Sequence, residues 1–467
     1  MSEPTTATPA PQGRRTAAGR RVNPTVVIGV VLVGLTVGAL LLVSPHEAAD
    51  RSAGPETARL TSASVGCPAA LVGAGTVSVA TGEPELKGDV TVTGSGEPRS
   101  LALDAPGTST VDAEDPVAVT GTGDMAAGLL AARFGGDQLA AVDCPRPSPE
   151  AWFTGVGAGA RHDSVIELVN PDEGPAVADI SVYGRGGQID VPGLRGVTVR
   201  GQDSVRLQLG QLLPRRSELA LHVTVSRGRL AASLLDQVPS LGARPATEDF
   251  LPSQPAPGLD QVLLGLPAGQ GEDVLAVANP GEDEARVKIK VLTADSEFAP
   301  EGLEELRVAP GTVRTVSLTS IVRGAIGDGA LGLTVTSTRP VTTTLRSVVD
   351  DDLSHVAPVA ASAEAMTLLL PPGDARVVLG DATGVGVATV SAWTADGRAL
   401  EEQKVELKPG QGGVVDLPRG AALVRVGTQR AAVHAAAIVT GPGGAAVLGF
   451  RELLTESLIP DVRPGLS

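Results

Sequence analysis

The segment Ile166-Glu-Leu-Val-Asn-Pro171 recurs 109 residues later as Leu275-Ala-Val-Ala-Asn-Pro280. A run of alternating apolar and polar residues follows each copy, ADISVYGRGG from residue 178 and VKIKVLTADS from residue 287. A third run of this kind, ATVSAWTADG, begins at residue 388. Alternation with a period of two is typical of β-strands with one buried face, so these segments predict one β unit repeated along the chain.

A second marker supports the repeat. It is a glycine turn that leads into alternating apolar residues: GQDSVRLQL from Gly201, PGTVRTVSL from Pro310 and PGQGGVVDL from Pro409. The same turn, PGTSTVDA from Pro106, adds a copy nearer the N-terminus. Each turn precedes a predicted pair of strands, so the sequence predicts four repeats. These strand pairs cover residues 117–134, 219–237, 331–349 and 421–439.

The composition supports a mainly β fold. The chain has 58 Gly and 36 Pro in 467 residues, and only 2% of its residues are aromatic, so aliphatic side chains must fill the cores. Repeats of about 95–110 residues fit tandem immunoglobulin-like β-sandwich repeats. A β-propeller is the second choice because its blades need about 40–50 residues. The expected β repeats are 66–147, 148–252, 253–362 and 363–460.

The N-terminal part predicts a single membrane anchor. No charged residue occurs from Val22 to Pro45, and residues 25–43 are long enough as a helix to cross a bilayer. Four arginines precede this segment, which predicts a cytoplasmic N-terminus and a C-terminal bulk outside the cell membrane. A cleavable signal peptide is the alternative, although the apolar run is long for one. Residues 1–24 are expected to form a disordered cytoplasmic tail, and residues 44–65 a stalk.

Cys67 and Cys144 are the only cysteines, and both follow the predicted anchor. An oxidising compartment outside the membrane favours their pairing in a disulfide that closes the first repeat. A free catalytic thiol is the less favoured alternative.

Charge argues against a nucleic-acid partner. The chain carries a formal net charge of −16 and shows no basic patch after the four N-terminal arginines. The anionic field would repel a polyanion.

No motif for catalysis, for a metal ion or for a cofactor is evident. The five histidines (His46, His162, His222, His355 and His434) occur singly, and none has metal-ligand spacing to another His, Cys or carboxylate. The run Asp350 to Asp352 predicts a solvated turn more readily than a calcium site. A hydrolase would need acids from separate repeats to converge in one cleft. The sequence therefore predicts a protein that is not an enzyme.

Two aromatic residues at the start of the second repeat, Trp152 and Phe153, are candidate interface residues. They are expected to wedge the first two repeats together. The alternative is a sugar site, because exposed aromatic faces pack on pyranose rings.

The stretch CPRPSPEAWFTGVGAGARHDSVIELVNP, from residue 144 to 171, resembles an actinobacterial family of unknown function, with Trp152, Asn170 and Pro171 as its most recognisable marks. The resemblance implies a membrane-anchored, extracytoplasmic protein, often encoded near glycosyltransferases, and it supplies no catalytic residues. We therefore expect a non-enzymatic structural or scaffolding protein of the cell envelope. The alternative is a glycan-binding or accessory protein in envelope polysaccharide assembly. The expected partners are the membrane, envelope proteins or cell-wall glycans.

Overall fold

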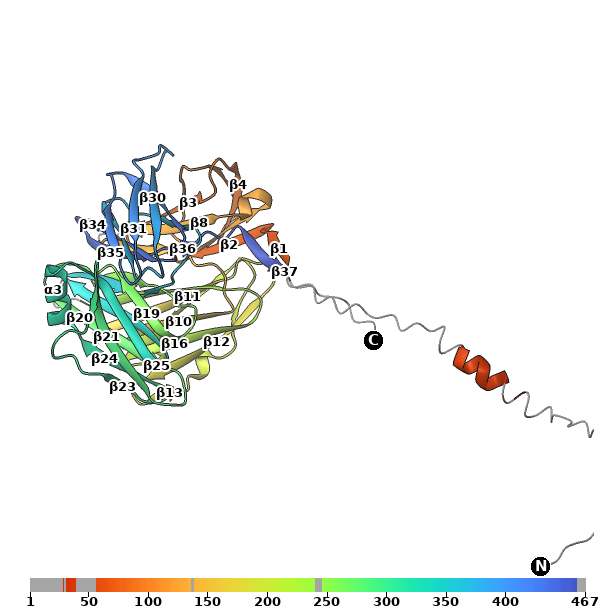
Figure 1. Cartoon of the computed structure of the whole chain (residues 1–467), viewed down its shortest axis with the longest axis horizontal. Helices are drawn as coiled ribbons and strands as arrows, with labels where there is room; N and C mark the ends of the chain where they lie inside the picture. The colour runs from red at the N-terminus through yellow and green to blue at the C-terminus, as the bar shows by residue number, and fades with distance from the viewer. Residues whose placement is uncertain (1–27, 29–30, 39–55, 136–137, 240–245, 460–467) are drawn as a thin grey trace, which may run out of the picture. The chain divides into compact units, whose positions relative to one another are not determined.

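The computed structural model of the chain describes residues 28, 31–38, 56–135, 138–239 and 246–459 (Figure 1). Residues 57–458 form one compact unit. Residues 28 and 31–38 are helical, and no helix in the described part is long and apolar enough to cross a membrane. The expected tail, most of the expected anchor and residues 44–55 of the expected stalk lie outside the described residues.

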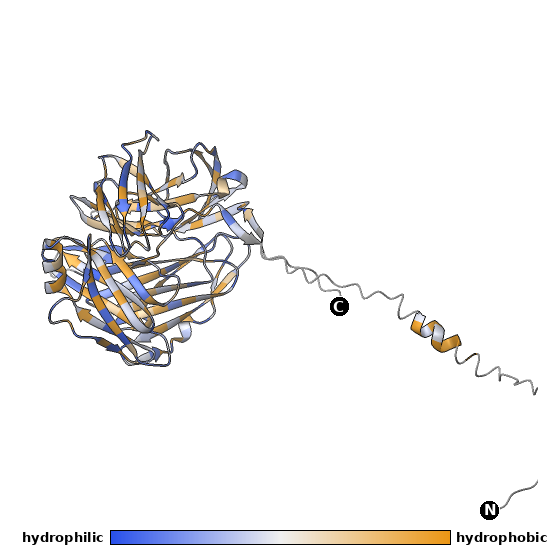
Figure 2. Ribbon diagram, viewed as in Figure 1, coloured by the Kyte–Doolittle hydropathy of each residue, from blue (hydrophilic) through white to orange (hydrophobic). Residues whose placement is uncertain are grey.

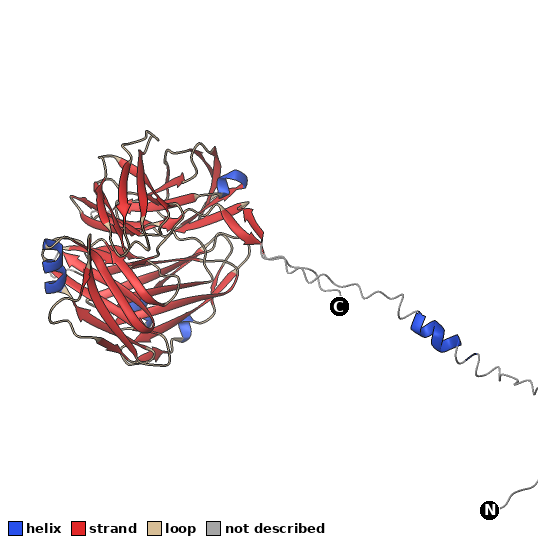
Figure 3. Cartoon of the chain, in the orientation of Figure 1, coloured by secondary structure: helices blue, strands red, loops and turns tan. Residues whose placement is uncertain are grey.

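The regular secondary structure of the compact unit is almost entirely β-strand, as Figure 3 shows. The strands group into four modules of similar length along the chain. Module 1 contains β2 (Ser62–Cys67), β3 (Thr76–Thr81), β4 (Lys87–Thr93), β5 (Arg99–Asp104), β6 (Ser109–Asp112), β7 (Val117–Thr122), β8 (Leu129–Gly135) and β9 (Ala140–Asp143). Module 2 contains β10 (Glu150–Gly159), β11 (His162–Val169), β12 (Ala176–Gly184), β13 (Gly187–Ile189), β14 (Val197–Val199), β15 (Ser204–Gln208), β16 (Arg216–Arg227), β17 (Ala231–Val238) and β18 (Thr247–Leu251).

Module 3 differs in that one long strand, β25, takes part in both of its sheets. This module contains β19 (Gly258–Leu264), β20 (Gly271–Asn279), β21 (Ala285–Thr293), β22 (Glu297–Phe298), β23 (Leu306–Val308), β24 (Thr312–Ser317), β25 (Ala330–Val349), β26 (Asp352–Val356) and β27 (Pro358–Val359). Module 4 contains β28 (Met366–Leu369), β29 (Asp374–Gly380), β30 (Gly386–Thr394), β31 (Gln403–Leu407), β32 (Gly413–Asp416), β33 (Ala421–Gln429), β34 (His434–Gly441), β35 (Gly444–Gly449) and β36 (Arg451–Glu452).

A few short elements complete the described chain. The two-stranded sheet of β1 (Glu56–Arg59) and β37 (Glu456–Ile459) brings its two ends together. The short helices are η1 (Gly123–Ala126), η2 (Pro192–Leu194), α2 (Leu209–Leu212) and α3 (Thr319–Gly327).

The same strand order recurs in all four modules. In module 1 the sheets run β2-β7-β4-β5 and β6-β3-β8-β9, and in module 4 the equivalent strands run β28-β33-β30-β31 and β32-β29-β34-β35. Modules 2 and 3 repeat these pairings, with one parallel pairing between β12 and β24 connecting them. In an immunoglobulin domain the first strand pairs with the second, whereas here the main pairings of the first strand are β2 with β7, β10 with β16, β19 with β25 and β28 with β33. The fold is thus mainly β, and its strand order departs from the expected immunoglobulin-like one.

The markers found in the sequence fall on equivalent strands. The glycine turns precede equivalent strands of the four modules, which are β6, β15, β24 and β32. The strand pairs that follow them are β7 and β8, β16 and β17, the long strand β25, and β33 and β34. The first module begins earlier than expected, because β2 starts at Ser62 within the expected stalk.

Both sheets of a module contribute to one core. In module 2, Phe153, Ile180 and Leu221 from one sheet pack with Ile166 and Leu234 from the other. Apolar and polar residues alternate along many strands, as Figure 2 shows, and β30 alternates between buried and half-buried positions over its whole length. Aliphatic side chains therefore fill the cores, as the low aromatic content predicts.

The repeated Asn-Pro segment has a structural explanation. The Asn170 side-chain amide donates to the carbonyl oxygens of Gly174, Val199 and Arg200, and its Oδ1 accepts from the backbone N–H of Asp172. The Asn279 side chain forms the equivalent four bonds in module 3, to Asp283, Val308, Ala309 and Gly281. Both asparagines are buried, so each joins loops at one end of its module.

The four modules contact one another in a closed, propeller-like ring. Buried apolar clusters join module 1 to 2, 2 to 3, 3 to 4 and 4 back to 1. In a propeller each position would be one sheet, whereas here it is a two-sheet module. The equivalent strands β9, β18, β26 and β35 contact one another in turn, so they line the centre of the ring.

Candidate functional site

The centre of the ring contains a cluster of buried ionisable side chains. His162 and Asp236 come from β11 and β17 of module 2, and Asp249 comes from β18. They lie on the same faces as the core residues Ile166, Leu234 and Leu251 of their strands, at the end of the module 2 core. His355 on β26 of module 3 reaches into this cluster.

Asp236 is the acceptor at the centre of the cluster. Its carboxylate oxygens lie 2.7 and 2.8 Å from Nε2 of His162 and 3.0 Å from Nε2 of His355, and the Ser164 hydroxyl donates to it at 2.5 Å. Burial alone would raise the pKa of Asp236, but the attraction and hydrogen bonds of His162 and His355 hold it well below its usual range. Asp236 is thus a buried carboxylate that depends on donors from two modules.

The two histidines have different surroundings. Arg346 of β25 lies 2.7 Å from Nδ1 of His162. An arginine can only donate, so Nδ1 accepts and the proton of His162 lies on Nε2, facing Asp236. Nδ1 of His355 lies 3.8 Å from Asp249 instead. Burial alone would lower the pKa of His355, but its interactions with Asp236 and Asp249 raise it to about 9.

Module 4 closes the cluster on its other side. The Asp352 carboxylate at the start of β26 accepts a hydrogen bond of 2.8 Å from the backbone N–H of Ala445 in β35. Burial raises the pKa of Asp352 to about 7, with repulsion from Asp249 adding to the effect. A Cβ at Gly444 would lie 2.1 Å from the Asp352 side chain, so glycine permits this close approach. Asp350 and Asp351 do form a turn with positive φ, whereas Asp352 is buried rather than solvated.

The cluster joins modules and is closed to solvent. His162 is 7% exposed, His355 1% and Asp236 0%, so the group does not line a cleft open to a substrate. Within the described ranges no group of three or more His, Cys, Asp or Glu is arranged to hold a metal ion. His162 and Ser164 hold Asp236 within module 2, and the contacts of His355 and Arg346 of module 3 and of Asp352 with Ala445 join modules. The cluster therefore connects modules 2, 3 and 4 at the centre of the ring.

A cavity of about 580 Å³ lies beside this cluster. All four modules and the segments that join them contribute to its wall, including Arg146 after β9, Phe153 and Leu251 of module 2, Val359 of β27 and Phe450 before β36. Its volume and mostly apolar wall are typical of small-molecule sites. It is the strongest candidate binding site in the described structure.

Charged residues gather at one side of the cavity. Asp143 forms an ion pair of 3.0 Å with Arg451, which connects module 1 to module 4. Arg146 makes one hydrogen bond, of 3.4 Å, to the Glu452 carbonyl oxygen. Burial raises the pKa of Asp143 and lowers that of Arg146. This side of the cavity therefore contains charges that water solvates only in part.

The aromatic pair expected to be an interface is divided between two environments. Phe153 belongs to the module 2 core and also lines the cavity. Trp152 is 4% exposed, stacks on His222 with ring centres 3.9 Å apart, and lies near Tyr183. It exchanges two backbone hydrogen bonds with Gln254, whose side chain bonds to Thr343 of module 3. Trp152 thus packs on rings of module 2 beside the segment that leads to module 3, and its burial leaves no open platform for a sugar.

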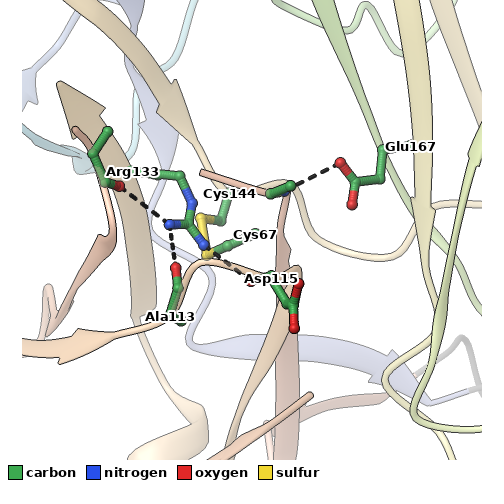
Figure 4. The surroundings of a disulfide bond; sticks show 8 residues. Cys67, Ala113, Asp115, Arg133, Cys144 and Glu167 are labelled. Atoms are coloured by element: carbon green, nitrogen blue, oxygen red, sulfur yellow. Dashed lines mark hydrogen bonds between the residues drawn. A yellow bond between two sulfur atoms is a disulfide. The ribbon is translucent and has the colours of Figure 1, made fainter. Parts of the chain in front are cut away.

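Cys67 and Cys144 form a disulfide in module 1, as predicted (Figure 4). The buried guanidinium of Arg133 beside it donates to the carbonyl oxygens of Ala74, Ala113 and Asp115. Glu167 of module 2 accepts a hydrogen bond from the backbone of module 1 at Ala69. The disulfide therefore lies close to the junction between the first two modules. Pro171, the other expected family mark, follows Asn170 in the buried turn after β11.

Comparison with known proteins gives a family but no activity. A model described as a family of unknown function, DUF5719, matches residues 102–418. The chain belongs to this family. The match covers the central cluster, Arg146 and Trp152, and it ends before Phe450 and Arg451 of the cavity wall. No curated protein matches the sequence.

The sequence prediction missed the central cluster because its members are far apart in the chain. His162 and Asp236 are separated by 74 residues, and Asp236 and His355 by 119. A signal was nevertheless present. In the SLLDQ segment of β17, Asp236 lies two residues after Leu234, so both side chains are on the inward face of the strand. In β11, His162 and Ser164 are on the same inward face as Ile166 for the same reason. Charged or polar residues in the buried phase of a strand indicate a satisfied network or a site.

Proposed function

We propose that this chain is a non-enzymatic scaffolding protein of the cell envelope, held at the membrane by residues 25–43 and presenting its β modules outside the cell. The observation that carries the proposal is the closed ring. Four modules pack through buried seams, and a buried polar cluster joins three of them at the centre. Such a body presents surfaces at fixed positions, which is what a scaffold requires.

Two features support the location outside the membrane. The disulfide between Cys67 and Cys144 is of the kind that persists in oxidising compartments. The uncharged segment after four arginines has the charge asymmetry of a single-pass anchor with a cytoplasmic N-terminus. Both features agree on the side that faces outward.

The location is testable with the lysines of the chain. All five lysines follow the apolar segment, and the Lys87 side chain is 70% exposed. A membrane-impermeant amine reagent applied to intact cells is expected to label the protein without permeabilisation. Deletion of residues 25–43 is the control, and the shortened protein should no longer sediment with membranes. Labelling that requires lysis would contradict the proposed orientation.

The scaffolding role is testable by its partners. Crosslinking in intact cells is expected to recover a reproducible set of envelope proteins, and the same set should be lost when the ring is opened by Asp236→Ala. The alternative, a glycan-binding or accessory role in envelope polysaccharide assembly, predicts retention of the protein on purified cell-wall glycans. Retention on glycans without protein partners would replace the scaffold proposal by that alternative.

A further inference from the structure

The central cavity has walls suited to an apolar ligand. Phe153, Leu234, Leu251, Val447 and Phe450 are buried residues of its lining. Water in such a space finds few hydrogen-bond partners, so its replacement by an apolar group is favourable. The volume of about 580 Å³ lies within the usual range for a small-molecule site.

Arg146, at the side of this cavity, has hydrogen-bond donors without a protein acceptor in the described structure. A guanidinium carries five N–H donors, yet in the described structure Arg146 uses one of them, in the 3.4 Å bond to a backbone carbonyl. The other arginine of the lining, Arg451, is already paired with Asp143 at 3.0 Å. Burial lowers the pKa of Arg146, and the attraction of the neighbouring Asp143 carboxylate offsets this only in part. An anionic oxygen would supply the remaining compensation.

The remaining carboxylates of the lining are engaged with neighbours. Glu150 pairs with His222 at 3.1 Å, and the Glu452 carboxylate accepts from the Ser362 hydroxyl at 2.7 Å. Neither is within hydrogen-bonding distance of Arg146 in the described structure. The free side of the Arg146 guanidinium therefore favours a ligand anion.

We propose that the cavity at the centre of the ring binds a single-chain amphiphile with an anionic headgroup, of the fatty-acid type. The acyl chain lies against Leu234, Leu251 and Phe450, and the carboxylate pairs with Arg146. This site does not depend on the scaffolding role. The apolar interior of the cavity would bind the acyl chain of this ligand, and the charged side would bind its headgroup.

The test uses the full chain in the membranes of the cells that produce it. A photoactivatable palmitate with its reactive group near the end of the acyl chain is added, irradiated and mapped by mass spectrometry. Crosslinks are expected in peptides that contain residues 141–153, 250–255 and 447–454, and excess palmitate should remove them. Crosslinks confined to residues 25–43, or spread evenly over the surface of the modules, would overturn the proposal.

Two probes and three variants separate recognition from partition into the membrane. The methyl ester of the same probe, which lacks the charge, should label the cavity at least tenfold less. Arg146→Gln should reduce labelling by about tenfold, which corresponds to the loss of one charge-assisted hydrogen bond. Val225→Trp, a half-buried lining position, should block labelling by filling the space.

Arg419→Gln is the matched control, because Arg419 is 89% exposed and lies outside the cavity lining. It should label as the wild type does. Thermal unfolding of each variant shows whether the ring is intact. Equal labelling by acid and ester, or by wild type and a folded Arg146→Gln variant, would refute the anionic site.

Discussion

Two contacts between modules differ in chemistry: the junction between modules 2 and 3, and the seam between modules 4 and 1. The first depends on Asp236, His162 and His355, which are buried and bonded to one another. The second has an apolar cluster of Ala80, Leu130, Ala132, Leu369 and Leu423, with the Asp143–Arg451 ion pair beside the cavity, whereas the apolar cluster between modules 2 and 3 is smaller. An apolar seam tolerates small shifts, whereas a buried polar network stabilises only when every partner is in place. The comparison indicates that the polar junction fixes the geometry of the ring and the apolar seam holds it closed.

The largest expected effect comes from Asp236→Ala. This change leaves three buried donors, His355, His162 and Ser164, without their shared acceptor, and it removes an attraction that keeps His355 protonated. Loss of one partner of a buried charged pair costs roughly 3–5 kcal/mol. Urea unfolding followed by tryptophan fluorescence should show this loss at pH 7. A cost below about 1 kcal/mol would mean that the cluster does not hold the junction.

Leu130→Ala is the corresponding change in the apolar seam. Leu130 is 4% exposed, and truncation of such a side chain costs about 3 kcal/mol through lost burial and the cavity left behind. The cost should be the same at pH 7 and pH 9, because no ionisable group belongs to this cluster. A strong pH dependence of the Leu130→Ala effect would contradict the distinction between the two junctions.

The wild-type protein should lose stability between pH 7 and pH 9. The pKa of His355 is raised to about 9 from an ordinary value near 6.5, so the folded state holds this proton more tightly than the unfolded state. Its contribution is complete below about pH 6.5 and is lost as the pH rises through 9, which amounts to about 2 kcal/mol over this interval. Asp352, with its pKa raised to about 7, acts in the same direction at lower pH.

Denaturation curves at several pH values measure this slope. His355→Gln is the control, because it removes the titrating group and should flatten the profile between pH 7 and pH 9. An unchanged slope in the variant would assign the pH dependence to other groups.

The smallest expected effects concern the repeated asparagines. Asn170→Ala and Asn279→Ala each remove four hydrogen bonds to equivalent backbone groups. Each should cost about 1–3 kcal/mol, because buried backbone groups are left unpaired. Differential scanning calorimetry should give similar costs for the two variants, with no pH dependence. A large difference between the two costs would show that the equivalent asparagines do not contribute equally to stability.

Much of the strand pattern could be predicted from the sequence, for a physical reason. Alternation of apolar and polar residues reports which face of a strand is buried, and glycine turns report where strands begin. Both signals are local, so the sequence predicts the strands from β6 to β8 in module 1, from β15 to β17 in module 2, β24 and β25 in module 3, and from β32 to β34 in module 4. The order of strands within the sheets is set by long-range pairing, which such local signals do not report.

The ring and its sites could not be predicted from local sequence patterns. Alternation shows that β17 has a buried face but not that His355 covers its end, and Arg146 carries no local sign of a cavity. The sequence marks Trp152 as unusual, but its stacking on His222 depends on the pairing of β10 with β16, which the local pattern does not report. Sequence signals thus identified residues that matter without identifying their partners.

Hydrogen exchange read by mass spectrometry tests the central claim that the four modules form one body. Peptides from the central strands β9, β18, β26 and β35 are followed in the full-length protein, as wild type and as Asp236→Ala. If the ring is one cooperative structure, the four peptides exchange with the same free energy of opening, and the variant lowers it in all four. If modules 1 and 4 keep their wild-type protection while modules 2 and 3 lose theirs, the modules are independent and the account is contradicted.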